Sequence, residues 1–434
     1  MIFDLHPIWG LLPLLLYIVL SFKKGTHPVA NVGICTILGA ILVKQPLGKL
    51  GAVVHGSMSS FLVLVGLIIM LGGGLGSVLR KTGVAANIVS VLTKRIGIKN
   101  QNRAIIATMI CSIVLIALLG TPAGANAVIA PIIIPLVSSV GLTPSSLATI
   151  FLGAGSTGMF LGPLSPIMVT LMGLTGLTYP QLLFSAGLPL SVVMWVSTFL
   201  IVKKIQKDTE GTETFGIDLV SGPREDSATP ESKRATTVFV ISMLCLVGYG
   251  IFSSGGASYV IVVMVTTSLL TGISGGMSAG EVLNSMMEGA GKLIWLFFMF
   301  ILFDPFLKFV EQTGAFSALV NLTEPYIAST GKLGFALLTT LIGIFGINGA
   351  AVAQAIMMDK LFNPFLNTLG VSPNLWALIL MIGMSITSFA YPGVDMLGQM
   401  GLAHAKNIKP MMKLSYLAII PASVLLVAVA SIFI

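Results

Sequence analysis

Short polar side chains stand where glycine and proline interrupt the long apolar stretches of this sequence. The interruptions are GTPAGAN (120–126) and GAGSTG (153–158) in the first half, and GAAVAQA (349–355) and GMSITS (383–388) in the second. Hydroxyl and amide groups avoid the cost of burying a charge, while unwound backbone offers carbonyls to Na⁺ and N–H groups to a carboxylate. The candidate ligands for small ions are Thr121, Asn126, Ser156, Thr157, Asn348, Gln354, Ser385 and Thr387.

Three residues of this set, Asn126, Ser156 and Ser385, are the expected oxygen ligands of Na⁺. No organic cofactor is predicted, and Na⁺ or H⁺ is the expected coupling ion. The alternative is that Gly, Ser and Thr at these positions only let helices pack closely. Their recurrence in both halves favours binding over packing.

Two acidic residues lie near the interruptions, and an ionisable group within a membrane is by default a functional hypothesis. Asp359 follows the second-half interruption, and Asp395 lies three residues beyond Pro392. Each is a candidate ion ligand, with a salt bridge or an exposed loop position as the alternative. The sequence contains no HExxH motif and no Ser–His or paired-Asp arrangement at matching depth, so an enzyme is not predicted.

The composition requires lipid as the solvent for most of the chain. Of 434 residues, 55% are hydrophobic and only 9% are charged, far below the share of about 25% in soluble domains. The net charge of +8 does not indicate nucleic-acid binding, because the basic residues occupy short loops between apolar runs without interleaved aromatics. We therefore expect an all-α polytopic membrane protein.

The chain reads as two copies of one unit, offset by about 229 residues. Gly120 matches Gly349, Pro135 matches Pro364, Ser156 matches Ser385, and Pro163 matches Pro392 without a gap. This agreement indicates an internal duplication. The expected units are a first repeat at 1–202, a polar cytoplasmic linker at 203–235 and a second repeat at 236–434. The predicted spans lie near 5–22, 28–43, 57–79, 144–175 and 180–202, and near 236–252, 258–273, 289–309, 373–404 and 412–434.

Each half also holds an apolar stretch that is too short for two crossings and is broken in its middle, at 103–140 and 332–369. Both are predicted as re-entrant hairpins, whose non-helical tips must be buried in protein or line a cavity. Five transmembrane helices plus one hairpin per half make the two repeats inverted. This topology places 18 Lys and Arg on the linker side and 5 on the other, with both termini outside.

At these motifs the sequence resembles the ion transporter superfamily. GGGLGSVLRKTGVAANIVSVLTKRIG (72–97) is similar to gluconate permease-type anion transporters, and 120–166 and MMDKLFNPFLNTLGVSP (357–373) resemble NhaC-type sodium/proton antiporters. The resemblance implies inverted repeats, re-entrant hairpins and Na⁺- or H⁺-coupled movement of small ions. In the antiporter pattern acidic residues flank a PLS element, whereas none lies near 162–166 here. This departure favours an organic anion.

The expected function is secondary active transport of a small organic anion, a mono- or dicarboxylate, coupled to Na⁺ or H⁺ by alternating access. The alternative is Na⁺/H⁺ antiport, which requires a carboxylate that binds Na⁺ and H⁺ in turn. The two candidate carboxylates for that role are Asp359 and Asp395. The expected location is a bacterial-type cytoplasmic (inner) membrane. The sequence leaves the oligomeric state open, with a homodimer as one expectation.

Overall fold

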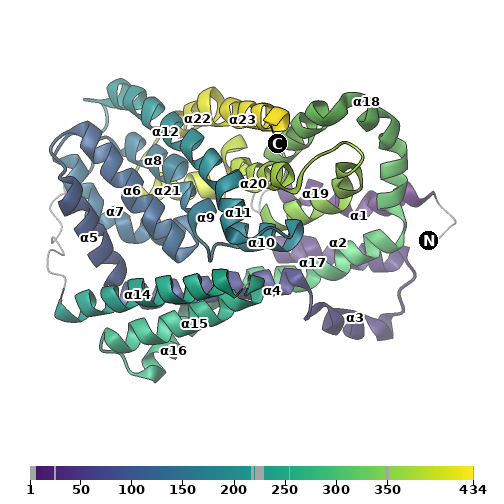
Figure 1. The fold of residues 1–434 in the computed structure, drawn as a ribbon, viewed down its shortest axis with the longest axis horizontal. Helices are drawn as coiled ribbons and strands as arrows, with labels where there is room; N and C mark the ends of the chain where they lie inside the picture. The colour runs from purple at the N-terminus through teal and green to yellow at the C-terminus, as the bar shows by residue number, and fades with distance from the viewer. Residues whose placement is uncertain are drawn as a thin grey trace.

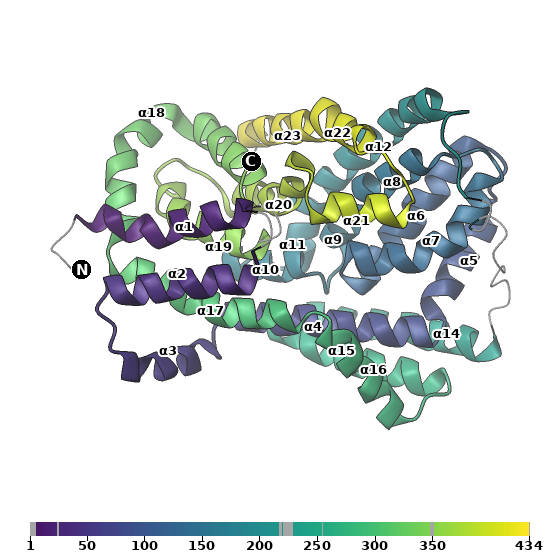
Figure 2. The ribbon, with the colours of Figure 1, turned by 180° about the vertical axis from the view of Figure 1, so that it is seen from behind.

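The computed structural model describes residues 6–23, 26–216, 219, 229–253, 255–347 and 351–433, and every regular element in these ranges is helical. Figure 1 shows α4, α14, α15, α16 and α17 as a layer along one side, with α12, α22 and α23 opposite. The helices that carry the predicted interruptions lie between these two layers (Figures 1 and 2). The prediction of an all-α polytopic membrane protein is confirmed.

The helices follow the same broad order in the two halves, including a π-helical segment in the last long helix of each, Leu183–Gly187 and Ser415–Ile419. The first half contains α1 (Leu12–Phe22), α2 (Pro28–Leu42), α3 (Leu50–Ser57), α4 (Phe61–Lys81), α5 (Val84–Ile96), α6 (Gln101–Leu119), α7 (Pro122–Ser138), α8 (Pro144–Ser156), α9 (Gly158–Leu161), α10 (Pro166–Thr175), α11 (Tyr179–Leu182) and α12 (Leu188–Thr209). The second contains α14 (Pro230–Phe252), α15 (Gly256–Ser274), α16 (Ala279–Gly291), α17 (Ile294–Gln312), α18 (Ala315–Ile344), α19 (Ala351–Leu366), α20 (Pro373–Ala390), α21 (Val394–Leu402), α22 (Lys409–Leu414) and α23 (Ile420–Phe433).

Seven helices in the described ranges are long and apolar enough to cross a membrane, or nine if each of two bent pairs counts as one span. The bent pairs are α8–α9 with α10 (47°) and α16 with α17 (58°). The first two predicted spans form shorter apolar helices, and α6, predicted as a hairpin arm, is itself long enough to cross. The count of ten crossings and the inverted orientation of the repeats stay predictions.

The burial of the helices separates a centre from a periphery. In α20, 83% of the apolar window is buried inside the protein, whereas in α14 only 22% is. An apolar helix with so little protein cover must face lipid. The broken span α20–α21 therefore begins at the centre of the molecule, where a binding site is best shielded.

The two predicted hairpins are present as pairs of contacting helices, α6 with α7 and the end of α18 with α19. Gly120 ends α6 in the left-handed region (φ 71°), which only glycine adopts without strain, and Pro122 starts α7 where a missing N–H costs nothing. In the second half, α18 runs from Ala315 to Ile344 with a break in helical geometry at Gly331 (φ 65°). Whether either pair re-enters the membrane stays a prediction.

Part of the predicted linker 203–235 is helical. α12 continues to Thr209, and α14 begins at Pro230, where the Thr229 hydroxyl accepts from Ser232 N (3.2 Å). Residues 217–218 and 220–228 of this linker lie outside the described residues. The domain boundaries and the cytoplasmic placement of the linker stay predictions.

Two exposed glycines test the inverted topology. Gly51 and Gly280 are the second residues of α3 and α16 and correspond at the repeat offset of 229, and a Cβ at either would meet nothing within 4 Å. We expect single cysteines at Gly51 and Gly280, in a cysteine-free background, to react with an impermeant maleimide from opposite sides of the membrane. Labelling of both from one side would contradict the inversion.

Candidate functional site

The first-half cluster centres on Asn126, which lies in the second turn of α7. Its Oδ1 accepts from the Ser112 hydroxyl on α6 (2.7 Å), and its Nδ2 donates to Gln399 Oε1 on α21 (2.7 Å). Asn126 and Ser112 are fully buried and Gln399 is 2% exposed. Because α21 belongs to the second half, this chain of hydrogen bonds joins the two halves at the hairpin.

The broken span beside this hairpin carries the other two first-half candidates. The Thr157 hydroxyl donates to Ala154 O (2.7 Å) and accepts from Trp195 Nε1 on α12 (2.7 Å). The half-buried Ser156 donates its hydroxyl hydrogen to Leu152 O, which leaves its oxygen lone pairs available. Thr121, directly before α7, makes no capping hydrogen bond.

Glycines allow α8 and α9 to touch the α6 arm of the hairpin. A Cβ on Gly155 would lie 2.3 Å from the Ser112 hydroxyl oxygen, and one on Gly158 would lie 2.6 Å from Ile113 O. In the second half the same close approach joins α18 to α20, because a Cβ on Gly343 would lie 2.8 Å from Gly383 Cα. In each half, therefore, the broken span is held directly against its hairpin.

The second-half cluster centres on Gln354 in the first turn of α19. Its Oε1 accepts from Ile347 N (2.6 Å), and its Nε2 donates to Gly343 O (2.6 Å) and Gly383 O (3.1 Å). The buried Thr387 hydroxyl lies 2.8 Å from Gly343 O. The structure thus brings together two of the predicted ligands, Gln354 and Thr387, whose side chains lie 3.4 Å apart (Nε2 to Oγ1). The predicted ligand Asn348 lies outside the described residues.

Ser385 differs from the other candidates because its buried hydroxyl has no hydrogen-bond partner in the described ranges. A buried hydroxyl without a partner costs free energy, about 1–3 kcal/mol. The Ser385 hydroxyl oxygen is sealed from solvent in this conformation and keeps its hydrogen-bonding capacity unused. This observation is compatible with the expected role of Ser385 toward Na⁺.

Among the described residues, the two acidic candidates make no hydrogen bond to either amide cluster, and Asp395 precedes Gln399 by one turn of α21. Asp359 accepts from Trp376 Nε1 (2.8 Å) and Asn363 Nδ2 (3.1 Å), and its neighbour Lys360 forms an ion pair with Glu311 on α17. Asp395 is exposed in the first turn of α21 and accepts from the Ser388 hydroxyl (2.6 Å). Neither carboxylate forms a hydrogen bond with Asn126 or Gln354 in the described ranges, so the hydrogen bonds within the amide clusters join neutral groups.

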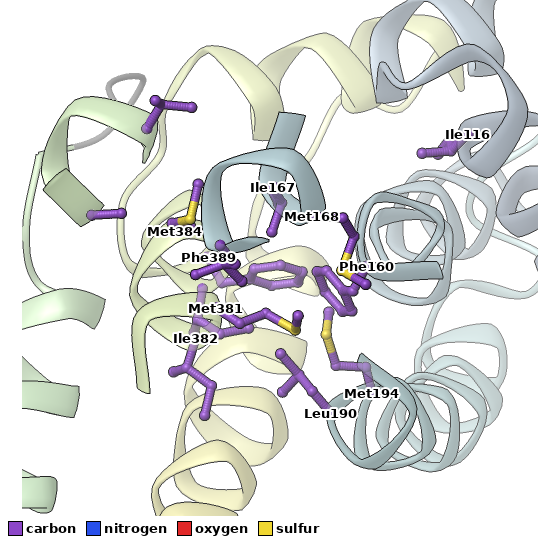
Figure 3. Close-up of a cluster of buried hydrophobic side chains, with 14 of the residues drawn as sticks. Ile116, Phe160, Ile167, Met168, Leu190, Met194, Met381, Ile382, Met384 and Phe389 are labelled. Atoms are coloured by element: carbon purple, nitrogen blue, oxygen red, sulfur yellow. The ribbon is translucent and has the colours of Figure 1, made fainter. Parts of the chain in front are cut away.

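The second segments of the two broken spans pack reciprocally across the halves. α10 from the first half contacts α19 and α20, and α21 from the second half contacts α7 and α8. Figure 3 shows the apolar side of this arrangement, where Met168 of α10 and Phe160 of α9 meet Met381 and Phe389 of α20. A movement of either half must therefore change the surroundings of both interruptions.

Three residues of the site escaped the sequence analysis: Ser112, Trp195 and Gln399. Ser112 and Trp195 look like isolated polar or aromatic positions within apolar helices, and Gln399 lies 273 residues from its partner Asn126. The sequence holds one signal for Gln399, which is its position one helical turn after the candidate ligand Asp395. No cluster of three or more His, Cys, Asp or Glu side chains that could hold a metal occurs among the described residues.

The fold is that of a multi-pass membrane protein, and comparisons with known proteins point to transporters. Residues 16–205 match the model of the Na+/H+ antiporter family. The search of curated proteins gave no match. The matched residues 16–205 make up less than half of the chain and lie within its first half.

Two solved transporters have a similar fold. MtrF of Neisseria gonorrhoeae, described as illuminating a class of antimetabolite efflux pumps, is 16% identical with a TM-score of 0.64 over 95% of this chain and 96% of its own. The YdaH transporter of Alcanivorax borkumensis, described as having an unusual topology, is 15% identical with a TM-score of 0.57 over 94% and 98%.

At such identities the likeness establishes the fold, and it covers nearly the whole of all three chains. Together with the family match, it supports a secondary transporter rather than an enzyme. The narrower resemblance to NhaC-type antiporters and gluconate permease-type transporters stays a prediction.

Proposed function

We propose that this protein is a secondary active transporter that moves a small organic anion, a mono- or dicarboxylate, by alternating access coupled to Na⁺ or H⁺. The observation that carries the proposal is the pair of neutral amide and hydroxyl clusters at the interruptions of both halves, with the carboxylates of Asp359 and Asp395 outside them. The proposed location is the cytoplasmic membrane of a bacterial-type cell.

A neutral cluster suits an anion with a co-transported cation. A buried carboxylate would repel an anionic substrate, whereas amide and backbone N–H groups donate to it. Serine and amide oxygens serve a partly dehydrated Na⁺ without adding a fixed charge. We assign this cation role to Asn126, Ser156 and Ser385, and the free hydroxyl of Ser385 supports it.

Alternating access fits the reciprocal packing of α10 and α21. Each is a short helix that belongs to one half and contacts the hairpin arm and broken span of the other. A rigid-body shift between the halves would open one interruption as it closes the other. Substrate bound between them would then face the two sides of the membrane in turn.

The experiment for this proposal is uptake by proteoliposomes that contain the purified protein. Radiolabelled lactate, succinate and gluconate are offered separately, with an imposed inward Na⁺ gradient, an imposed H⁺ gradient or neither. We expect gradient-dependent accumulation of at least one of these carboxylates above protein-free liposomes. Equal signals with and without protein for all three would contradict the proposal for these substrates.

A second candidate function is Na⁺/H⁺ antiport, which the family match over residues 16–205 favours. It would need a carboxylate that binds Na⁺ and H⁺ in alternation, and Asp359 and Asp395 are the two available candidates. Both accept hydrogen bonds from neutral donors, Trp376 and Ser388 respectively, which hold their side chains in place.

Neutralising the two acids separates these functions. Because the neutral clusters supply the proposed ligands, we expect Asp359→Asn and Asp395→Asn each to retain carboxylate uptake, within about threefold of wild type. An antiporter would lose all exchange, since an amide cannot release and rebind a proton. Uptake abolished by either substitution, in protein that remains monodisperse, would contradict the neutral-site account.

A further inference from the structure

Three glutamines are buried within the described ranges, and they differ in how their amides are used. Gln206 accepts from Thr143 N (3.0 Å) and Ser146 Oγ (2.8 Å) and donates to Gly141 O (2.7 Å). Gln354 likewise accepts through its oxygen and donates through its nitrogen. The amide oxygen and amide nitrogen of both residues therefore have hydrogen-bond partners within the protein.

Gln399 is the exception. Its Oε1 accepts from Asn126 Nδ2 (2.7 Å), but its Nε2, with two N–H donors, has no partner in the part of the chain that the structure describes. The Gln399 side chain is almost completely buried, with 2% of its surface exposed. The exposed part includes the amide nitrogen Nε2. A buried amide that keeps its donors unpaired in a site is available to an acceptor on a ligand.

A second set of free donors lies one turn away on α7. Ala125 N makes the first hydrogen bond of this helix, to Thr121 O (3.1 Å), so the N–H groups of Ala123 and Gly124 precede it and have no intrahelical acceptor. Thr121 does not cap them, and both residues are exposed. The positive end of the α7 dipole thus lies next to the turn that carries Asn126, to which Gln399 is bound.

We propose that Gln399 is a specificity-determining residue whose Nε2 donates to the carboxylate of the transported anion, which is bound at the start of α7. The inference rests on the proposed function and names the residue that completes its anion site. The donors would come from both halves, because α7 belongs to the first and α21 to the second. An anion that bridges them would link substrate binding to the relative position of the two halves.

The polarity of the hydrogen-bond chain favours an anion over a cation at this point. In the amide orientations of this structure, Ser112 donates to Asn126 Oδ1, Asn126 donates to Gln399 Oε1, and the chain ends in N–H groups. Reversal of both amides would present an oxygen instead, and the Na⁺ measurement below distinguishes the two orientations. N–H groups cannot coordinate Na⁺, whereas a carboxylate accepts them in short charge-assisted bonds. Asn126 is then oriented by Gln399 as well as by Ser112.

The test uses two substitutions that separate ligand binding from support of Asn126. Gln399→Glu keeps an oxygen that accepts from Asn126 Nδ2 but replaces the free donors with a carboxylate oxygen. Gln399→Met removes both functions at similar volume. We expect both variants to raise the dissociation constant of the bound carboxylate by about tenfold or more at neutral pH and saturating Na⁺.

The control is Asn407→Asp, which makes the same amide-to-carboxylate change in an exposed loop and keeps an oxygen for Lys409 N. The readout is the binding of labelled lactate, succinate and gluconate to purified, monodisperse protein. The same binding measured over a range of Na⁺ concentrations gives the affinity for Na⁺. The control should bind like wild type.

Weak binding by Gln399→Met with normal binding by Gln399→Glu would reduce Gln399 to a support for Asn126. Tighter Na⁺ binding by Gln399→Glu with unchanged carboxylate affinity would make it a cation ligand, and either result overturns this inference alone. Failure of the wild type to bind any of the three carboxylates would instead remove the proposed function and this inference with it.

Discussion

Alanine at Asn126 is expected to weaken the affinity for substrate or coupling ion by about tenfold or more. The change removes a candidate ligand and leaves the Ser112 hydroxyl and Gln399 Oε1 without their partner, at about 1–3 kcal/mol for each unsatisfied group. Because the loss is local, folded protein should still be recovered, with a lower melting temperature. Equilibrium binding and thermal unfolding of the purified variant measure the two effects separately.

The matched control is Asn87→Ala. Asn87 is also buried and donates across a helix pair, from α5 to the Thr236 hydroxyl on α14 (2.8 Å), away from both interruptions. It should lose stability without losing affinity. Alanine at four other candidate ligands, Ser156, Thr157, Ser385 and Thr387, should weaken affinity as well. Lower yield with wild-type affinity throughout this series would mean that these residues only pack.

The second large effect is expected at Gly158, where even one methyl group lacks room. A Cβ would lie 2.6 Å from Ile113 O and 2.7 Å from Ala117 N, and both neighbours are backbone atoms of α6. Gly158→Ala must therefore push α8–α9 away from the hairpin, which we expect to destabilise the fold by about 1–3 kcal/mol and to lower uptake strongly. Thermal unfolding in detergent and proteoliposome uptake are the measurements.

Gly280→Ala provides the comparison for this prediction. Gly280 is also helical, but a Cβ there meets nothing within 4 Å, so alanine should be neutral or slightly stabilising through its higher helix propensity. Equal stability of the two alanine variants would show that α6 and α8–α9 do not approach each other as closely as the glycines indicate.

The helices and their interruptions could be predicted from the sequence because they depend on local chemistry. Apolar runs of spanning length, Gly120 before Pro122, and Pro163 and Pro392 after the polar clusters are visible without any tertiary information. The predicted breaks near residues 120 and 157 appear as the turn between α6 and α7 and the junction of α8 with α9. The predicted break at 383–388 is wrong, because this segment is helical within α20 and the helix is interrupted only at 391–393. The short helices α3, α5 and α16 carry weaker signals and were not predicted as separate elements.

The partners of the site residues could not be predicted, because they depend on how distant helices pack. Periodicity cannot show that Gln399 reaches Asn126, or that Asp359 turns toward Trp376 instead of the Gln354 cluster. Ser385 and Thr387 look equivalent in sequence, yet the Thr387 hydroxyl lies near Gly343 O while Ser385 has no described partner.

The most direct test of the central claim is a pair of measurements on the same proteoliposomes, carboxylate accumulation and Na⁺-driven proton movement. The neutral clusters at Asn126 and Gln354 predict accumulation of a labelled carboxylate under an imposed ion gradient. They also predict little proton movement, followed with a pH-sensitive dye, when Na⁺ is added without organic anion. Robust Na⁺/H⁺ exchange without any organic anion, abolished by Asp359→Asn or Asp395→Asn, would contradict the account and establish antiport instead.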